Sequence, residues 1–118
     1  MSGLYRFDCV FYYVSEMDRA IAFYQGVLGF KVLSRDVVAR FEVDGTLFEL
    51  VPATDHGKLS GSGNARLALR VENLNEVLEE LRARGVPVTA AENKGTGLLA
   101  FLRDPDGNEI CLWQYFSM

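Results

Sequence analysis

The alternation of apolar and polar residues along the chain predicts the same series of elements twice. In the first half, an apolar run at residues 6–14 has the composition of a strand. Residues 17–28 have apolar positions three and four apart, which indicates a helix, and Gly29 supplies the stop signal. Three more strands are expected at residues 30–34, 37–43 and 46–51.

The second half follows the same order. A strand is expected at residues 65–71, and Asn73 is a suitable N-cap for a helix that ends at Arg84 and Gly85. Further strands are expected at residues 86–90, 97–102 and 108–115. Each half is therefore a β-α-β-β-β module, and the predicted fold class is α+β.

We expect one domain over residues 1–118, with module 1 at residues 4–52 and module 2 at residues 65–118. The linker at residues 53–64 is rich in Gly and Ser. It contains His56, the only histidine of the chain, which we expect to be exposed.

Strand alternation divides the side chains between two faces of each sheet. The all-aliphatic faces suit packing against the helices. The two-residue turn Asp44-Gly45 sets the pairing of its hairpin and places Arg40 opposite Glu49. Aromatic rings, sulfur and charge on the second face are typical of a ligand cavity. The residues assigned to this second face are Cys9, Phe11, Tyr13, Arg66, Arg70, Cys111, Trp113 and Tyr115.

Composition excludes several classes of protein. The 118 residues suit one domain, and 12 Lys plus Arg against 16 Asp plus Glu give a net charge of −4. With a pI near 4.9 and no basic stripe, neither a nucleic acid nor an anionic membrane surface is an expected partner. We expect no signal peptide, and no apolar run reaches the roughly 18 residues that a membrane helix needs. We expect a cytoplasmic protein.

Two parts of the sequence resemble the vicinal oxygen chelate superfamily, which includes glyoxalase I, extradiol dioxygenases, fosfomycin-resistance enzymes and bleomycin-resistance proteins. The opening module matches in DCVFYYVS at residues 8–15, AIAFY at 20–24 and VLGF at 27–30. The closing strand pair matches in FLRDPDGNEI at residues 101–110. The resemblance implies two modules whose eight strands form a curved sheet around a central cleft, in a homodimer.

The resemblance also locates four positions for a metal site. Metal-dependent members carry His on the first strand, an acidic residue on the fourth, His on the fifth and Glu on the eighth, and their metal polarises substrate oxygens. The matching residues here are Cys9, Glu49, Arg66 and Cys111. Because a guanidinium has no lone pair to offer, Arg66 cannot be a ligand. We therefore expect neither metal nor other cofactor, with one divalent metal as the alternative.

The candidate site residues leave several interpretations open. Glu49 can pair with Arg66, in the place of the metal, or with Arg40, and the pair is either structural or also meets an anionic ligand group. For Cys9 and Cys111 three interpretations stay open. They are simply small buried residues, or soft metal ligands together with Glu49, or thiols whose pKa a nearby arginine lowers. The aromatic residues belong either to the core or to a cavity wall.

The leading hypothesis is a protein similar to the bleomycin-resistance branch that binds a small aromatic or amphipathic molecule without a metal; whether it is an enzyme stays open. The alternative is a metal-dependent lyase, isomerase or dioxygenase similar to glyoxalase I, with Glu49 as ligand or general base. A third interpretation is an interaction module whose cleft is filled by its own aromatic residues. The predicted ligand-binding residues are Cys9, Phe11, Tyr13, Arg40, Glu49, Arg66, Cys111 and Trp113.

Overall fold

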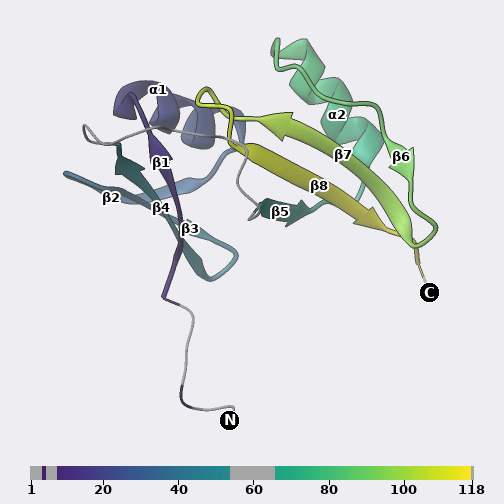
Figure 1. The fold of residues 1–118 in the computed structure, drawn as a ribbon. Helices are drawn as coiled ribbons and strands as arrows, with labels where there is room; N and C mark the ends of the chain where they lie inside the picture. Colours follow the sequence, from purple (N-terminus) through teal and green to yellow (C-terminus); the bar gives the residue numbers. More distant parts are fainter. Residues whose placement is uncertain (1–3, 5–7, 54–65, 118) are drawn as a thin grey trace. The chain divides into compact units, whose positions relative to one another are not determined.

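A computed structural model describes residues 4, 8–53 and 66–117. The chain divides into two compact units, Met1–Leu59 and Ser60–Met118, and each has the element order β-α-β-β-β (Figure 1). The described residues form eight strands in two hydrogen-bonded sheets of four, one sheet in each unit. The predicted α+β class with two such modules is confirmed. His56 and most of the predicted linker lie outside the described residues.

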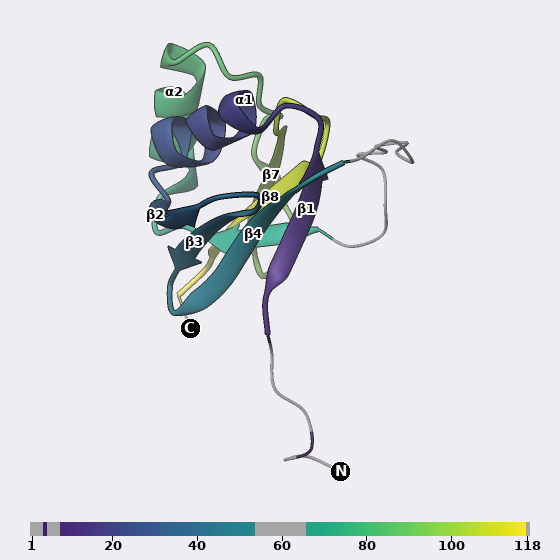
Figure 2. The same cartoon turned by 90° about the vertical axis from the view of Figure 1, so that its left-hand side faces the viewer.

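Unit 1 is a mixed sheet with helical turns between its first two strands. Its strand order is β1-β4-β3-β2, with β1 parallel to β4 and the other pairs antiparallel (Figure 2). The elements are β1 (Val10–Val14), α1 (Met17–Ile21), η1 (Ala22–Val27), β2 (Lys31–Arg35), β3 (Ala39–Val43) and β4 (Thr46–Pro52).

The helical segment of unit 1 begins and ends where the sequence predicts, but its geometry changes midway. The Glu16 carboxylate caps α1 by accepting hydrogen bonds from the backbone N–H groups of Asp18 and Arg19. From Ala22 to Val27 the backbone is a π-helix, and Gly29 ends the segment with a φ of 76°. Periodic apolar positions predict a helix and do not distinguish α from π.

The core of unit 1 is a cluster of aromatic rings between the helical segment and one sheet face. Tyr24 from η1, Phe41 from β3 and Phe48 from β4 are all buried. The ring centroid of Tyr24 lies 4.9 Å from that of Phe48 and 6.3 Å from that of Phe41. Phe41 and Phe48 are paired positions across the Asp44-Gly45 turn.

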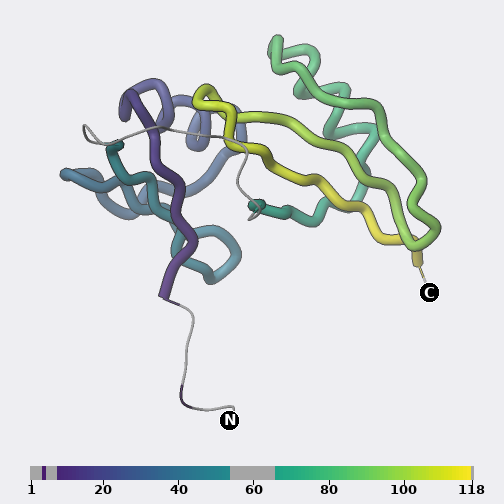
Figure 3. Tube along the Cα trace, in the orientation of Figure 1, coloured from purple at the N-terminus to yellow at the C-terminus, as the bar shows by residue number. Residues whose placement is uncertain are grey.

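Unit 2 repeats the arrangement with strand order β5-β8-β7-β6. Its longest strands, β7 and β8, form the extended hairpin that Figure 3 shows in yellow-green and yellow. The predicted N-cap is confirmed, because the Asn73 side chain accepts a hydrogen bond from the backbone N–H of Glu76. The elements are β5 (Leu67–Arg70), α2 (Leu74–Ala83), β6 (Glu92–Asn93), β7 (Gly97–Arg103) and β8 (Glu109–Tyr115).

The strand predicted at residues 86–90 is wrong. That segment forms one isolated bridge, between Val88 and Leu102, and the short strand beside β7 is Glu92–Asn93 instead. Pro87 supplies the physical reason, because it has no N–H to donate to a sheet ladder.

One face of each sheet is packed, and the other carries half-exposed side chains, as strand alternation predicts. In β1, Val14 is fully buried, whereas Phe11 and Tyr13 are 47% and 52% exposed. In β8, Ile110 is buried and Tyr115 is 50% exposed. We call the exposed faces open face 1 and open face 2. Open face 1 comprises Cys9, Phe11, Tyr13, Arg40, Glu42 and Glu49, and open face 2 comprises Arg66, Arg70, Arg103, Glu109, Cys111, Trp113 and Tyr115.

In the part of the chain that the structure describes, no helix has the length and apolar character needed to cross a membrane.

Candidate functional site

An ion pair lies at the centre of open face 1. Arg40 and Glu49 are paired positions of β3 and β4, as the hairpin turn predicts, and the Arg40 Nε donates to the Glu49 Oε2 at 3.1 Å. The Glu49 side chain is 17% exposed and that of Arg40 is 40% exposed. Of the two partners expected for Glu49, the structure shows Arg40.

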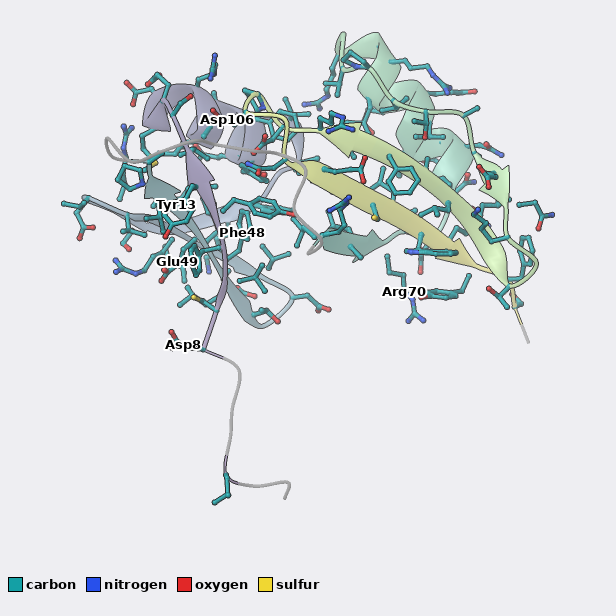
Figure 4. All side chains as sticks on the ribbon, viewed as in Figure 1. Asp8, Tyr13, Phe48, Glu49, Arg70 and Asp106 are labelled. Atoms are coloured by element: carbon teal, nitrogen blue, oxygen red, sulfur yellow. The ribbon has the colours of Figure 1, made fainter. Side chains whose placement is uncertain are left out.

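Cys9 follows Asp8 in the chain and lies on the same open face as Glu49. Figure 4 labels both of these carboxylates, Asp8 just before β1 and Glu49 on β4. Burial raises the pKa of the Cys9 thiol above its usual value, and the negative charges of Glu49 and Asp8 raise this pKa further. The interpretation of Cys9 as a thiol with a lowered pKa is therefore wrong. Glu49 pairs with the Arg40 guanidinium, and its charge favours the neutral form of the Cys9 thiol.

Two exposed aromatic rings border this ion pair. Phe11 is the position of β1 that pairs with Glu49, and Tyr13 lies two residues further along the same face. Their rings meet edge to face, with centroids 5.6 Å apart and an interplanar angle of 89°. Because each is about half exposed, these rings belong to the surface of open face 1 and not to the aromatic core.

On open face 2 a single carboxylate joins two arginines. The Arg66 Nε donates to the Glu109 Oε1 at 2.6 Å, and the Arg103 Nη2 lies 3.2 Å from the Glu109 Oε2. The Glu109 side chain is 19% exposed. The sequence analysis did not single out Glu109, although alternation from Cys111 back by two residues places it on this face.

Cys111 lies two residues after Glu109 on the same strand and is buried. Burial raises the pKa of its thiol, the charge of Glu109 raises it further, and Arg66 opposes the change only in part. A lowered thiol pKa is therefore wrong for Cys111 as well. Both cysteines are free. Across the two described segments, no three His, Cys, Asp or Glu side chains are grouped so as to hold a metal ion.

The far end of open face 2 carries two stacked rings and a cation. The Trp113 and Tyr115 rings are nearly parallel, at 8°, with centroids 5.5 Å apart. The guanidinium carbon of Arg70 lies 4.9 Å from the centroid of the Tyr115 ring, a cation–π distance (Figure 4). We call these three residues the Trp-Tyr-Arg cluster.

The structure distributes the eight predicted site residues over the two open faces. Among those on open face 1, Arg40 pairs with Glu49, the charge of Glu49 acts on Cys9, and the remaining two form an aromatic pair. Those on open face 2 share a sheet with two residues that sequence analysis did not place in the site, Glu109 and Arg103. The first group is Cys9, Phe11, Tyr13, Arg40 and Glu49, and the second is Arg66, Cys111 and Trp113.

Comparison with known proteins agrees with this architecture. The family model of the Glyoxalase/Bleomycin resistance protein/Dioxygenase superfamily matches residues 6–112. The chain therefore belongs to that superfamily.

Similar proteins include both enzymes and a binding protein. The chain is 30% identical over 112 residues to the lactoylglutathione lyase of Neisseria meningitidis serogroup A, covering 82% of this chain and 81% of that one. It is 31% identical over 117 residues to the lactoylglutathione lyase GLX1 of Arabidopsis thaliana, covering 86% of this chain but only 41% of the plant protein. The chain thus spans about two fifths of that relative's length.

Among solved structures, the fold matches TnmS3, an antibiotic binding protein from Streptomyces sp. CB03234. The TM-score is 0.79 at 27% sequence identity, and the match covers 98% of this chain and all of TnmS3.

Proposed function

We propose that this protein binds a small aromatic or amphipathic molecule without a metal. One observation carries the proposal: both charged residues at the four family ligand positions already have an oppositely charged partner in their own unit. Glu49 is held by Arg40, and Arg66 is held by Glu109. A metal at Glu49 would have to displace the Arg40 guanidinium, and Arg66, at the matching position on β5, has no lone pair to offer a metal.

The exposed aromatic residues indicate the kind of ligand. Binding sites for small molecules combine apolar and aromatic walls with a few placed polar groups. Open face 1 offers the Phe11 and Tyr13 rings beside an ion pair, and open face 2 offers Trp113 and Tyr115 beside arginines. The similarity to TnmS3, whose described role is antibiotic binding, supports a binding function on this fold.

A metal-dependent lyase is the second candidate, and the relatives at about 30% identity that are lactoylglutathione lyases favour it. In that case Glu49 would leave Arg40 and bind a divalent metal, with Cys9 and Cys111 as further ligands. Two thiolates and a carboxylate are acceptable ligands for zinc, but both thiols here have a raised pKa, which opposes the deprotonation that metal binding requires.

Metal stoichiometry separates the two candidates. Purified protein is incubated with zinc, iron, nickel and manganese in turn, and bound metal is measured by elemental mass spectrometry. We expect less than about a tenth of an equivalent in every case, because the ligand set is incomplete. Nearly one equivalent, lost in Glu49→Ala and accompanied by lactoylglutathione lyase activity, would establish the second candidate instead.

A gain-of-binding variant serves as the positive control. The triple variant Cys9→His, Arg66→His, Cys111→Glu restores the ligand types of the metal-dependent members at the family positions other than Glu49. It is expected to take up about one equivalent of metal under the same conditions.

The two-fold homodimer implied by the family resemblance is also part of the proposal, and sedimentation equilibrium would show it as twice the chain mass of 13.2 kDa.

A further inference from the structure

Arg70 differs from the other arginines of the open faces because its charge is not balanced. Arg40 pairs with Glu49, and both Arg66 and Arg103 pair with Glu109. Within the described residues, Arg70 forms no salt bridge, and its guanidinium lies against the Tyr115 ring. An exposed guanidinium beside aromatic rings keeps its donors available for an anion.

Open face 2 as a whole carries an excess of positive charge, the same sign as the charge of Arg70. As defined above, it holds three arginines and one glutamate, Glu109, in a chain whose net charge is −4. Glu92 of β6 does not cancel this positive charge, because it forms a salt bridge with Lys94, the residue that follows β6. A positive face on an acidic protein attracts anions and repels cations locally.

The rings of the Trp-Tyr-Arg cluster determine the shape of a ligand. Trp113 and Tyr115 lie nearly parallel, so a flat ring system can extend the stack. Arg70 and Trp113 are paired positions on neighbouring strands, and the Arg70 guanidinium lies against the Tyr115 ring of the same stack. One unpaired guanidinium matches one carboxylate, which it can bind through two parallel hydrogen bonds.

We propose that the Trp-Tyr-Arg cluster recognises planar aromatic monocarboxylates and that Arg70 determines this preference for an anion. This inference rests on the proposed binding function and specifies its ligand class. The ring stacks on Trp113 and Tyr115, and the carboxylate binds the Arg70 guanidinium at the edge of the stack.

The test uses a signal that only this cluster can give. Trp113 is the single tryptophan of the chain, so a ¹⁵N-labelled sample has one indole N–H signal. We would titrate 2-naphthoate, its neutral analogue 2-naphthamide and the cation 2-naphthylmethylammonium, and follow this signal. We expect the acid to bind about five- to tenfold more tightly than the amide, because its carboxylate forms a charge-assisted hydrogen bond with Arg70. The cation should bind most weakly, because the charge of Arg70 repels it.

Two variants assign the preference to Arg70. In Arg70→Gln the acid and the amide should bind within about twofold of each other, whereas Arg70→Lys should keep part of the preference. Arg84→Gln is the matched control, because it removes one exposed arginine from the end of α2, where Arg84 pairs with Glu80. It should leave the five- to tenfold preference intact to within about twofold.

The outcomes separate the two proposals. Equal affinities for acid and amide in the wild type, or a preference for the cation, would overturn the inference about Arg70 and leave aromatic binding standing. A preference retained in Arg70→Gln would also overturn it. If no probe moves the indole signal, the stacking site itself is wrong. An indole signal that shifts with protein concentration alone would show that a second copy covers the cluster, which overturns the inference as well.

Discussion

Cys9 is a thiol next to two carboxylates, and its reactivity should follow their charge. Burial raises its pKa first, and the charges of Glu49 and Asp8 add to the effect. Removing one negative charge in Glu49→Gln lowers that pKa, so the thiolate fraction at a given pH rises. Alkylation of Cys9 by iodoacetamide at pH 8 should then be about two- to threefold faster, with the pH profile displaced to lower pH.

Cys111 provides an internal control in the same sample. Its raised pKa comes from burial and Glu109, not from Glu49. Its alkylation rate, read by mass spectrometry from its own peptide, should be unchanged by Glu49→Gln. A variant in which Cys9 reacts more slowly than in the wild type would contradict the assigned cause of the pKa shift.

Pairs of residues close in sequence could be predicted, and distant pairs could not. The Arg40–Glu49 ion pair followed from the Asp44-Gly45 turn, because a two-residue turn fixes the register of its hairpin. The Arg66–Glu109 pair joins residues 43 positions apart, and only the parallel alignment of β5 with β8 brings them together. The second partner of Glu109, Arg103, depends on the register of β7 and β8.

At the scale of elements, the order was predictable and some boundaries were not. The β-α-β-β-β order of both units was read from apolar periodicity and from turn residues. The strand expected at residues 86–90 was misplaced. The prediction followed the apolar composition of this segment and did not take account of Pro87, which cannot donate a hydrogen bond to a sheet. The register shift of β2 between Val32 and Ser34 was also not predicted, because a bulge leaves no mark in the alternation of so short a strand.

The hairpin of β7 and β8 depends on a glycine at its open end. A Cβ atom added at Gly97 would lie 2.3 Å from the backbone oxygen of Gln114 and 3.0 Å from the Cα of Tyr115. Both contacts are with backbone, so the strands would have to separate beside the Trp-Tyr-Arg cluster. Gly97→Ala should lower the free energy of unfolding by about 2–4 kcal/mol, measured by urea denaturation.

Gly26→Ala is the matched control for this substitution. Gly26 lies in η1, with no atom within 4 Å of the added Cβ and without a positive φ. The same methyl group should there raise the free energy of unfolding by about 0.5–1 kcal/mol, because alanine restricts the unfolded chain. If both variants unfold at the same urea concentration, the close approach at Gly97 does not limit the hairpin.

At the scale of the whole molecule, each unit carries a complete but small core. Helical segments cover one face of each sheet, and the other face keeps half-exposed aromatic rings such as Tyr13 and Tyr115. Each unit has 59 residues, and a chain of about 60 residues buries only about 60% of its unfolded surface. A core of that size is marginal on its own, which is why we expect the two modules to behave as one domain.

Separating the two units tests this expectation. Residues 1–59 and 60–118, produced as two fragments, should each lack a cooperative thermal transition and give poorly dispersed amide spectra, because neither buries enough apolar surface. The intact chain, followed by the same circular dichroism and NMR measurements, should unfold in a single transition, and mixing the fragments should restore part of it. A sigmoidal melt and a dispersed spectrum from either fragment alone would mean that the chain consists of two independent domains. Ligand binding on one open face would then leave the melting of the other unit unchanged.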